Sequence, residues 1–375
     1  MKRWILCAGG IVAAGLALAL AMGNPFARPA RAGAGGAAAT TAKDRPAMSG
    51  GADAAAQAAN PQAQAAADRR QSAQAAAARR QAVQTPVRAT REPEASAKSA
   101  AAVNAPHAAA AAAEYPPAEL VAACGRKAAQ IRDQYGDKLN VVAYPPFVVA
   151  GDMGVSQLES YAGQSVVRPA RAMWAAYFDK KPDQVITTFL YAGQDNYKLH
   201  ARKDYPDGGS PYYGYYNPAA RTMVMNINTG SGTLVHELTH ALVVYDFPNQ
   251  PTWFNEGLAS LHEQCNVEED GIKGLPNWRL PGLQAAIRDG KLRPLAELVT
   301  RRDFYGPAQG VNYAQARYFV LYMQHKGLLR EFYRHFRDHA DGDQPDVRAI
   351  EHVFGRKIAE IEPAFIAWVK TLKFE

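Results

Sequence analysis

Cysteine is scarce in this chain, which has only Cys7, Cys124 and Cys265 among 375 residues. Cys7 lies inside an N-terminal apolar run and is not preceded by the motif of a lipidated cysteine, which argues against a lipoprotein. Outside that run, only one disulfide can form, between Cys124 and Cys265. The alternative is two separate buried thiols, because the sequence does not show whether their Cα atoms approach each other.

An excess of basic charge is also missing from most of the chain. Of 42 basic and 35 acidic residues, 13 and 5 lie in residues 1–113, which leaves 29 basic and 30 acidic residues for the rest. A nucleic-acid-binding domain is expected to carry its own basic surface. Nucleic acid is therefore not an expected partner.

One long apolar run is present, at the N-terminus. Lys2 and Arg3 precede an unbroken apolar stretch over residues 4–22, and small residues around Ala21 and Gly23 suit a signal peptidase. The run is also nearly long enough to span a bilayer. Residues 1–23 are therefore predicted to be a signal peptide or an N-terminal membrane anchor. Either would place the protein in the periplasm or outside the cell, with an uncleaved run tethering it to the inner membrane.

Residues 24–113 contain little that could build a core. They are rich in Ala, Gln, Pro and Arg, and the stretch 64–71 recurs imperfectly at 74–81 without an apolar face. This segment is predicted to be a disordered linker, with its arginine pairs solvated. The ordered domain is predicted to cover residues 114–375.

Within that domain, the patterning predicts an α+β protein: a small mixed part, a central motif helix and then an α-helical part. The Gly- and Pro-rich range 205–218, with five tyrosines, is expected to be a loop that lines a groove or covers a sheet edge. The expected strands are 139–150 (interrupted at Pro145-Pro146), 184–192 and 222–227. The expected helices are 117–135, 158–178, 233–245, 280–288, 294–298, 313–325, 329–339, 347–354 and 358–372.

The central motif is His236-Glu237-Leu238-Thr239-His240. Positions four apart on a helix lie only ~40° apart around its axis, so both imidazoles share one face and can bind one metal ion. Sixteen residues after His240, beyond a short turn, Glu256 can face them from a second helix. Two histidines and a carboxylate form a typical catalytic zinc set, with the fourth position left to water.

Together with Trp253-Phe254-Asn255-Glu256-Gly257-Leu258-Ala259, this motif resembles the gluzincin branch of the zincin metallopeptidases, especially small secreted bacterial members. The resemblance covers about residues 140–330. It implies a thermolysin-like core: an edge strand above the cleft, the motif helix below it and a helical lobe beyond. It also implies that His236, His240 and Glu256 bind one Zn²⁺ and that Glu237 is the general base.

The resemblance further implies a tyrosine on a later helix that donates a hydrogen bond to the oxyanion. Tyr313 stands at that place, with Tyr318 as the alternative and Tyr322 expected in the core. The implied reaction is hydrolysis of a peptide or protein substrate by a water molecule that zinc activates and Glu237 deprotonates. Residues 222–228 would pair, as an edge strand, with the extended substrate backbone.

Other interpretations of the motif remain. The cluster could be a structural metal site or a buried polar cluster without metal, although a structural site usually has four protein ligands and no fourth is evident. A catalytically silent zincin-like module that binds envelope proteins or peptides would keep the fold without using Glu237. One departure from the family is Ser260, where some relatives carry an acid that orients a zinc-bound histidine. Of the other histidines, only His200 and His262 are plausible near the cleft.

Overall fold

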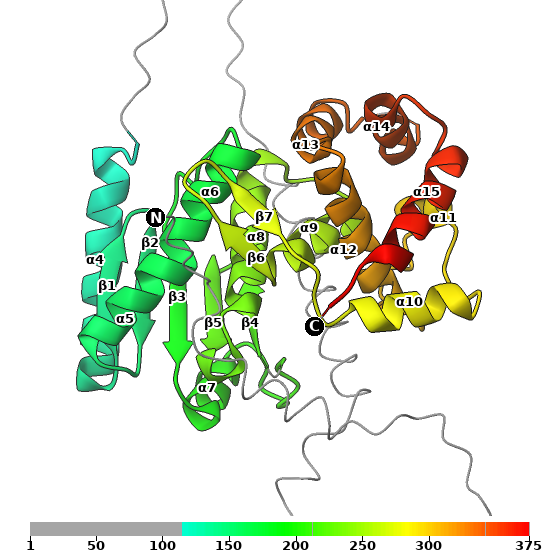
Figure 1. The fold of residues 1–375 in the computed structure, drawn as a ribbon. Helices are drawn as coiled ribbons and strands as arrows, with labels where there is room; N and C mark the ends of the chain where they lie inside the picture. The colour runs from blue at the N-terminus through cyan, green and yellow to red at the C-terminus, as the bar shows by residue number, and fades with distance from the viewer. Residues whose placement is uncertain (1–114, 212, 342, 375) are drawn as a thin grey trace, which may run out of the picture. The chain divides into compact units, whose positions relative to one another are not determined.

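The computed structural model describes residues 115–211, 213–341 and 343–374. Over these residues the fold is α+β, as predicted, with a five-stranded mixed sheet and helices on both of its faces (Figure 1). The predicted leader 1–23 and linker 24–113 lie outside the described residues. Within the residues described, no helix combines the length and the apolar composition that a bilayer span needs.

The sheet has the strand order β1-β2-β3-β5-β4. Strands β1 (Asn140–Tyr144) and β2 (Phe147–Gly151) form an antiparallel hairpin around Pro145-Pro146, where the sequence predicted an interruption. β3 (Ile186–Tyr191) runs parallel to β2, and β5 (Thr222–Asn226) runs parallel to β3. β4 (Gly214–Asn217) pairs antiparallel with β5, so Tyr216 lies opposite Met223.

The prediction that residues 222–228 form an edge strand is wrong. Residues 222–226 form β5, which lies between β3 and β4, so both of its sides already carry hydrogen bonds. The true edge is β4, inside the range expected to be a loop. Gly and Pro bound this short segment, but Tyr215 and Tyr216 point to opposite faces and are both buried, which is the pattern of a strand covered on both sides.

The two faces of the sheet carry separate cores, because alternate strand residues point in opposite directions. Val148 and Val224 face the smaller core, which α4 (Ala118–Tyr135) and α7 (Gln194–Ala201) cover. Val149 and Met223 face the main core. The helix expected at 158–178 lies on the main-core side as α5 (Val155–Tyr161), a π-helical stretch η2 (Ala162–Val167) and α6 (Arg168–Ala176).

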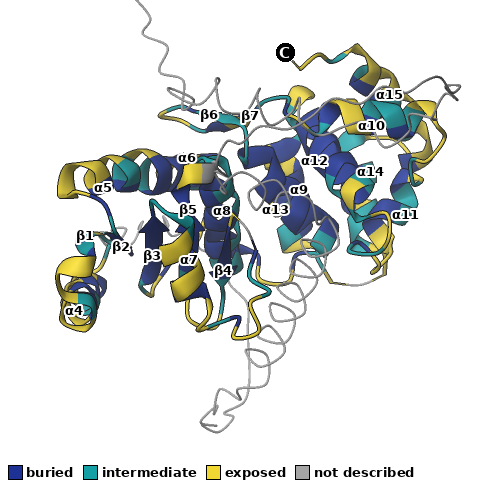
Figure 2. Ribbon diagram, turned by 90° about the horizontal axis from the view of Figure 1, so that it is seen from below, coloured by how far each residue is buried: buried dark blue, intermediate teal, exposed yellow. Residues whose placement is uncertain are grey.

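The motif helix α8 (Gly232–Asp246) and the next helix α9 (Thr252–His262) extend the main core away from the sheet and towards the C-terminal helices. α8, α9 and the later helix α12 (Gln309–His325) are buried over most of their length (Figure 2). The sequence did not predict α7 or the small antiparallel hairpin β6 (Cys265–Val267) and β7 (Ile272–Gly274). The expected C-terminal helices are present as α10 (Leu280–Arg288), α11 (Leu295–Thr300), α12 (Gln309–His325), α13 (Leu329–Asp338), α14 (Pro345–Phe354) and α15 (Ile358–Thr371). The short 3₁₀ turns are η1 (Gly136–Lys138) and η3 (Ile227–Thr229).

The disulfide considered between Cys124 and Cys265 does not form, because both cysteines are free thiols. Cys124 is buried in the smaller core under α4, whereas Cys265 packs against the main core. The two cores lie on opposite faces of the sheet, which keeps the two sulfur atoms apart.

Candidate metal centre

Helix α8 places both motif histidines on the same face. Leu234, Leu238 and Leu242 are fully buried in the main core and fix the rotation of the helix about its axis. The imidazoles of His236 and His240 then lie next to each other along the helix, one edge-on to the other, with their Nε2 atoms 3.0 Å apart. The sequence prediction of a shared helix face is confirmed.

The end of α8 is anchored so that the chain can turn back into α9. The carboxylate of Asp246 is buried and accepts hydrogen bonds from the backbone N–H groups of Asp179 and Lys180 at 3.1 and 2.8 Å. It also accepts from the hydroxyl of Tyr333 at 2.8 Å and from Arg337 at 2.9 Å. These bonds satisfy a buried charge and hold the α8–α9 turn in place.

Glu256, in the second turn of α9, completes a cluster that can hold a metal ion. Its Oε2 lies 3.5 Å from His236 Nε2 and 3.6 Å from His240 Nε2. In a tetrahedral site with bonds of ~2.0–2.1 Å, ligand atoms lie ~3.3–3.4 Å apart. The three donor atoms therefore surround a point from which all of them are within bonding distance of one ion. Glu256 Oε2 is buried, and within the described part of the chain it makes no hydrogen bond.

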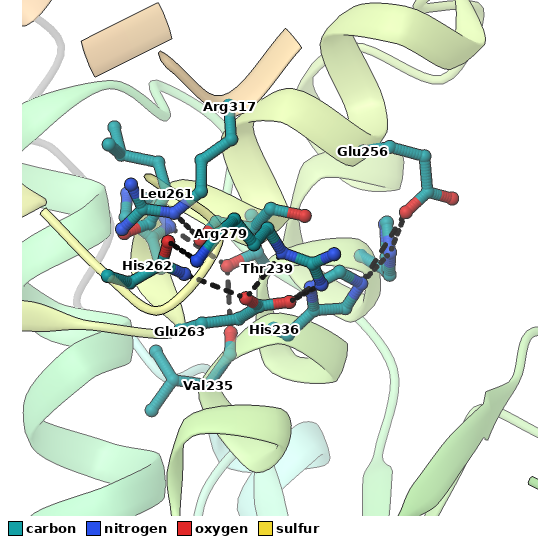
Figure 3. A network of polar contacts seen from close by, with 12 residues as sticks. Val235, His236, Thr239, Glu256, Leu261, His262, Glu263, Arg279 and Arg317 are labelled. Carbon is teal, nitrogen blue, oxygen red and sulfur yellow. Dashed lines mark hydrogen bonds and ion pairs between the residues drawn. The ribbon is translucent and has the colours of Figure 1, made fainter. Parts of the chain in front are cut away.

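The other nitrogen of His236 has an acidic partner that the sequence analysis missed. His236 Nδ1 lies 3.2 Å from Glu263 Oε1, and Arg279 holds the same carboxylate with bonds of 3.0 and 3.3 Å. Figure 3 shows these contacts joining Arg279, Glu263 and His236. The acid that is missing at Ser260 is therefore replaced by one seven residues after Glu256, a spacing of two helical turns that could have revealed it.

His240 is oriented by an amide. Its Nδ1 donates to Asn255 Oδ1 at 2.9 Å, and Gln250 Nε2 donates to the same oxygen at 2.8 Å. The amide oxygen keeps the proton on Nδ1, which leaves the lone pair of Nε2 facing Glu256. Asn255 directly precedes Glu256, so a single turn of α9 supplies both a candidate metal ligand and the hydrogen-bond partner of another.

Glu237 is buried beside the ligands without joining them. Burial raises the pKa of its carboxyl, against the opposing effect of His236 and His240. The backbone of Tyr216, on edge strand β4, hydrogen-bonds to this carboxyl group. Glu237 Oε2 is buried and has no hydrogen-bond partner among the described residues.

The charges in the cluster stabilise one another. Burial opposes the charge on His236, but Glu256 and Glu263 raise its pKa to about 10. In turn, the histidines hold the pKa of Glu256 well below its usual range despite its burial. Burial also opposes the charge on Glu263, yet Arg279 and His236 lower its pKa to about 2. The cluster therefore already favours the ionised carboxylates that a cation requires.

A tyrosine that the sequence analysis did not single out contacts the cluster directly. Tyr305, in the loop between α11 and α12, donates from its hydroxyl to Glu256 Oε1 at 2.6 Å. The predicted Tyr313 packs beside Tyr305 and Arg279. The centroid of its ring lies 6.2 Å from that of Tyr305 and 5.3 Å from the guanidinium of Arg279. Tyr318 and Tyr322 are both buried, and the hydroxyl of Tyr318 bonds to the backbone of Asn277.

The two other histidines considered for the cleft belong to the cores. His262 is fully buried, contacts Thr239 Oγ1 at 3.0 Å and stacks on Tyr177. His200 packs in the smaller core, where its Nδ1 lies 2.6 Å from the hydroxyl of Tyr191. Neither side chain contributes to the His236–His240–Glu256 cluster.

A scan against protein-family models finds no match to this chain, and a search of curated proteins finds none either. The functional argument therefore depends on the geometry of the cluster.

Proposed function

We propose that this protein is an exported zinc-dependent metallopeptidase with a gluzincin-like catalytic domain. The observation that carries the proposal is the triangle of His236 Nε2, His240 Nε2 and Glu256 Oε2, with edges of 3.0, 3.5 and 3.6 Å. The buried carboxyl of Glu237 lies beside it. Three protein ligands around one point leave a coordination position for water or substrate, as catalytic zinc sites do.

The choice of zinc follows from the ligand types. Two imidazoles and one carboxylate suit zinc in tetrahedral geometry, whereas calcium and magnesium prefer oxygen ligands alone. No thiol takes part in the cluster, which argues against a structural site of the cysteine type.

In the proposed reaction, zinc supplies Lewis-acid polarisation of the scissile carbonyl and lowers the pKa of a coordinated water towards ~7. Glu237 Oε2 accepts a proton as the water oxygen bonds to the carbonyl carbon. The same carboxyl group then delivers that proton to the leaving nitrogen as the C–N bond breaks. Its buried position and raised pKa suit a group that must both take and return a proton. Tyr313 remains the proposed donor to the oxyanion.

The arrangement around the cluster suits a peptide substrate. Strand β4 is at the edge of the sheet, so no strand within the described residues pairs with one side of its backbone. Helix α8 packs against β4, and Glu237 contacts the Tyr216 backbone there. An extended substrate can add to such an edge by backbone hydrogen bonds, which would place its scissile bond above the motif helix. This is the position that the gluzincin resemblance implies for the edge strand.

Glu237→Gln tests the proposal, since it keeps the size and shape of the side chain while removing the base. We expect zinc bound at one ion per chain, as in the wild type, and a fall in kcat/KM of at least ~10²–10⁴-fold. Zinc is measured by mass spectrometry of the purified protein, and hydrolysis by digestion of a broad peptide library. Glu269→Gln, at an exposed acid, is the matched control and should behave like the wild type.

The outcomes separate the alternatives. Wild-type protein that carries one zinc ion but cleaves no peptide would indicate a silent binding module. Wild-type protein that takes up no zinc would contradict both the metal site and the mechanism.

A further inference from the structure

We propose that Tyr305 is a positioning residue that holds the metal ligand Glu256 and thereby sets the affinity of the site for zinc. This inference depends on the metal site of the proposed function. It concerns a residue that lies in the α11–α12 loop, 49 positions after Glu256. Neither the motif nor the later tyrosines of the resemblance pointed to it.

The contact gives the two oxygens of the Glu256 carboxylate different partners. Oε1 accepts the hydrogen bond from the Tyr305 hydroxyl at 2.6 Å, while Oε2 faces the two imidazoles. A carboxylate without such a partner can rotate and present either oxygen, or both, to a cation. The phenol occupies Oε1 and leaves Oε2 as the single ligand atom. A one-oxygen ligand keeps the fourth coordination position open.

The loop holds Tyr305 in place without help from a metal. Phe304 is buried, and its ring packs edge-on against Tyr305 and Tyr313 at centroid distances of 5.4 and 5.1 Å. Asn312 Nδ2 donates to the carbonyl of Phe304 at 2.8 Å. On the other side, Arg293 makes two hydrogen bonds to Asp303, of 2.7 and 3.0 Å. The aromatic packing and the hydrogen bonds of the neighbouring residues Asp303 and Phe304 therefore hold the loop that directs the hydroxyl at Glu256.

The three ligands differ in where their partners come from. His236 and His240 contact Glu263 and Asn255, which belong to α9 or follow it directly. Glu256 itself contacts Tyr305, which belongs to the C-terminal helical part. Loss of the Tyr305 contact should therefore reduce metal binding without disturbing the α8–α9 pair. Outer partners of metal ligands typically contribute 10–100-fold in affinity.

The competing role for Tyr305 is donation to the oxyanion of the substrate. The two roles predict different effects on the zinc dissociation constant and on kcat. A residue that holds a ligand changes the zinc dissociation constant of the substrate-free protein. An oxyanion donor changes kcat and leaves that dissociation constant unaltered.

The experiment is a zinc titration of the full-length metal-free protein against a chromophoric chelator. For Tyr305→Phe, which removes only the hydroxyl, we expect the zinc dissociation constant to rise 10–100-fold. Peptidase activity should recover to near the wild-type value in excess zinc. Tyr313→Phe, in the same aromatic group, should leave the dissociation constant unchanged. The metal-free melting temperature of each variant shows whether it has folded.

A double-mutant cycle separates a direct contact from a general structural effect. If Tyr305 acts through Glu256, then adding Tyr305→Phe to Glu256→Ala should give less than a twofold further loss of zinc affinity, because the shared partner is already gone. Losses that add in full would overturn the proposal. So would a Tyr305→Phe variant with wild-type affinity and reduced kcat. A wild type that binds no zinc would instead contradict the proposed function, which this titration reveals independently.

Discussion

His262 illustrates how a histidine close to the candidate metal centre can have a purely structural environment. It is one turn of helix beyond Ala259 on α9 and is fully buried between Thr239 and Tyr177. Burial lowers the pKa of its imidazole from 6.5 to about 3, with a further contribution from the charge of Arg317. The side chain is therefore neutral in the folded protein at pH values where an unfolded chain would protonate it.

This difference predicts a pH dependence of stability. Because the folded pKa is the lower one, the unfolded state binds more protons below pH 6.5, and the free energy of unfolding falls as the pH decreases. One such group contributes ~1.4 kcal/mol per pH unit. His262→Gln should remove about that much of the slope between pH 6.5 and 4.5. The measurement is urea unfolding of the metal-free protein, with chelator present because metal binding itself releases protons.

The matched control is His325→Gln, the same substitution at an exposed residue of α12. Burial also lowers the pKa of His200, to about 4, so part of the acid sensitivity should persist in the His262 variant. Equal slopes for His262→Gln and the wild type would contradict the assignment.

The close packing of α9 on α12 sets the position of Glu256, the third proposed metal ligand. A Cβ atom on Gly257 would lie 3.0 Å from Val320 Cγ2 and 3.1 Å from the carbonyl oxygen of Ala316. The same two helices are joined by Arg317, which is fully buried on α12 and donates to the carbonyl of Ser260 at 2.9 Å. Glu256 directly precedes Gly257, so the spacing of the helices and the geometry of the ligand are linked.

Gly257→Ala should therefore push the two helices apart. We expect a loss of ~1–3 kcal/mol in the free energy of unfolding from overpacking, together with weaker zinc binding as Glu256 shifts. Chemical unfolding and the zinc titration measure the two effects. Gly125→Ala is the control: Gly125 lies on an exposed part of α4 with open space around it, so the alanine should stabilise the helix by ~0.5–1 kcal/mol. If both variants have the same stability, the close approach does not constrain the helices.

Across the whole described part of the chain, the candidate metal centre lies where the sheet side and the helical side of the main core meet. The core is continuous from Val149 on β2, through Leu238 on α8 and Phe254 on α9, to Phe365 on α15. The smaller core packs against the opposite face of the sheet, under α4. Each ligand helix is therefore held from two sides, which favours a rigid site.

The division between a catalytic domain and a non-catalytic leading segment is a prediction at this scale. Residues 24–113 carry paired arginines at 69–70 and 79–80, and we expect trypsin to cleave there first. Brief digestion should leave a fragment that begins between Gln71 and Ser99, because no Lys or Arg lies between Lys98 and Arg126, and this fragment should retain its zinc and its peptidase activity. Mass spectrometry identifies the fragment, and the zinc and peptide assays compare it with the intact protein. A fragment that loses zinc would show that the leading segment supports the site.

The three residues of the candidate metal cluster could be predicted because their geometry is largely local. His236 and His240 are one helical turn apart, so helix periodicity brings the two imidazoles together, and the short turn that follows lets Glu256 face them from the next helix. The same reasoning predicted most of the helices and three of the strands. Apolar periodicity is a property of residues that are close in sequence, so it predicts a helix or strand without knowledge of the contacts to distant segments.

Tertiary structure decided the contacts that join distant segments. Tyr305 reaches Glu256 across 49 positions, and no local pattern encodes the path of the loop that carries it. Strand β4 became the edge because of the pairing order of the sheet, and the two thiols stayed apart because they lie in different cores. Helix geometry determined which residues could bind a metal, whereas the packing of the whole chain determined which residues hold those ligands in place.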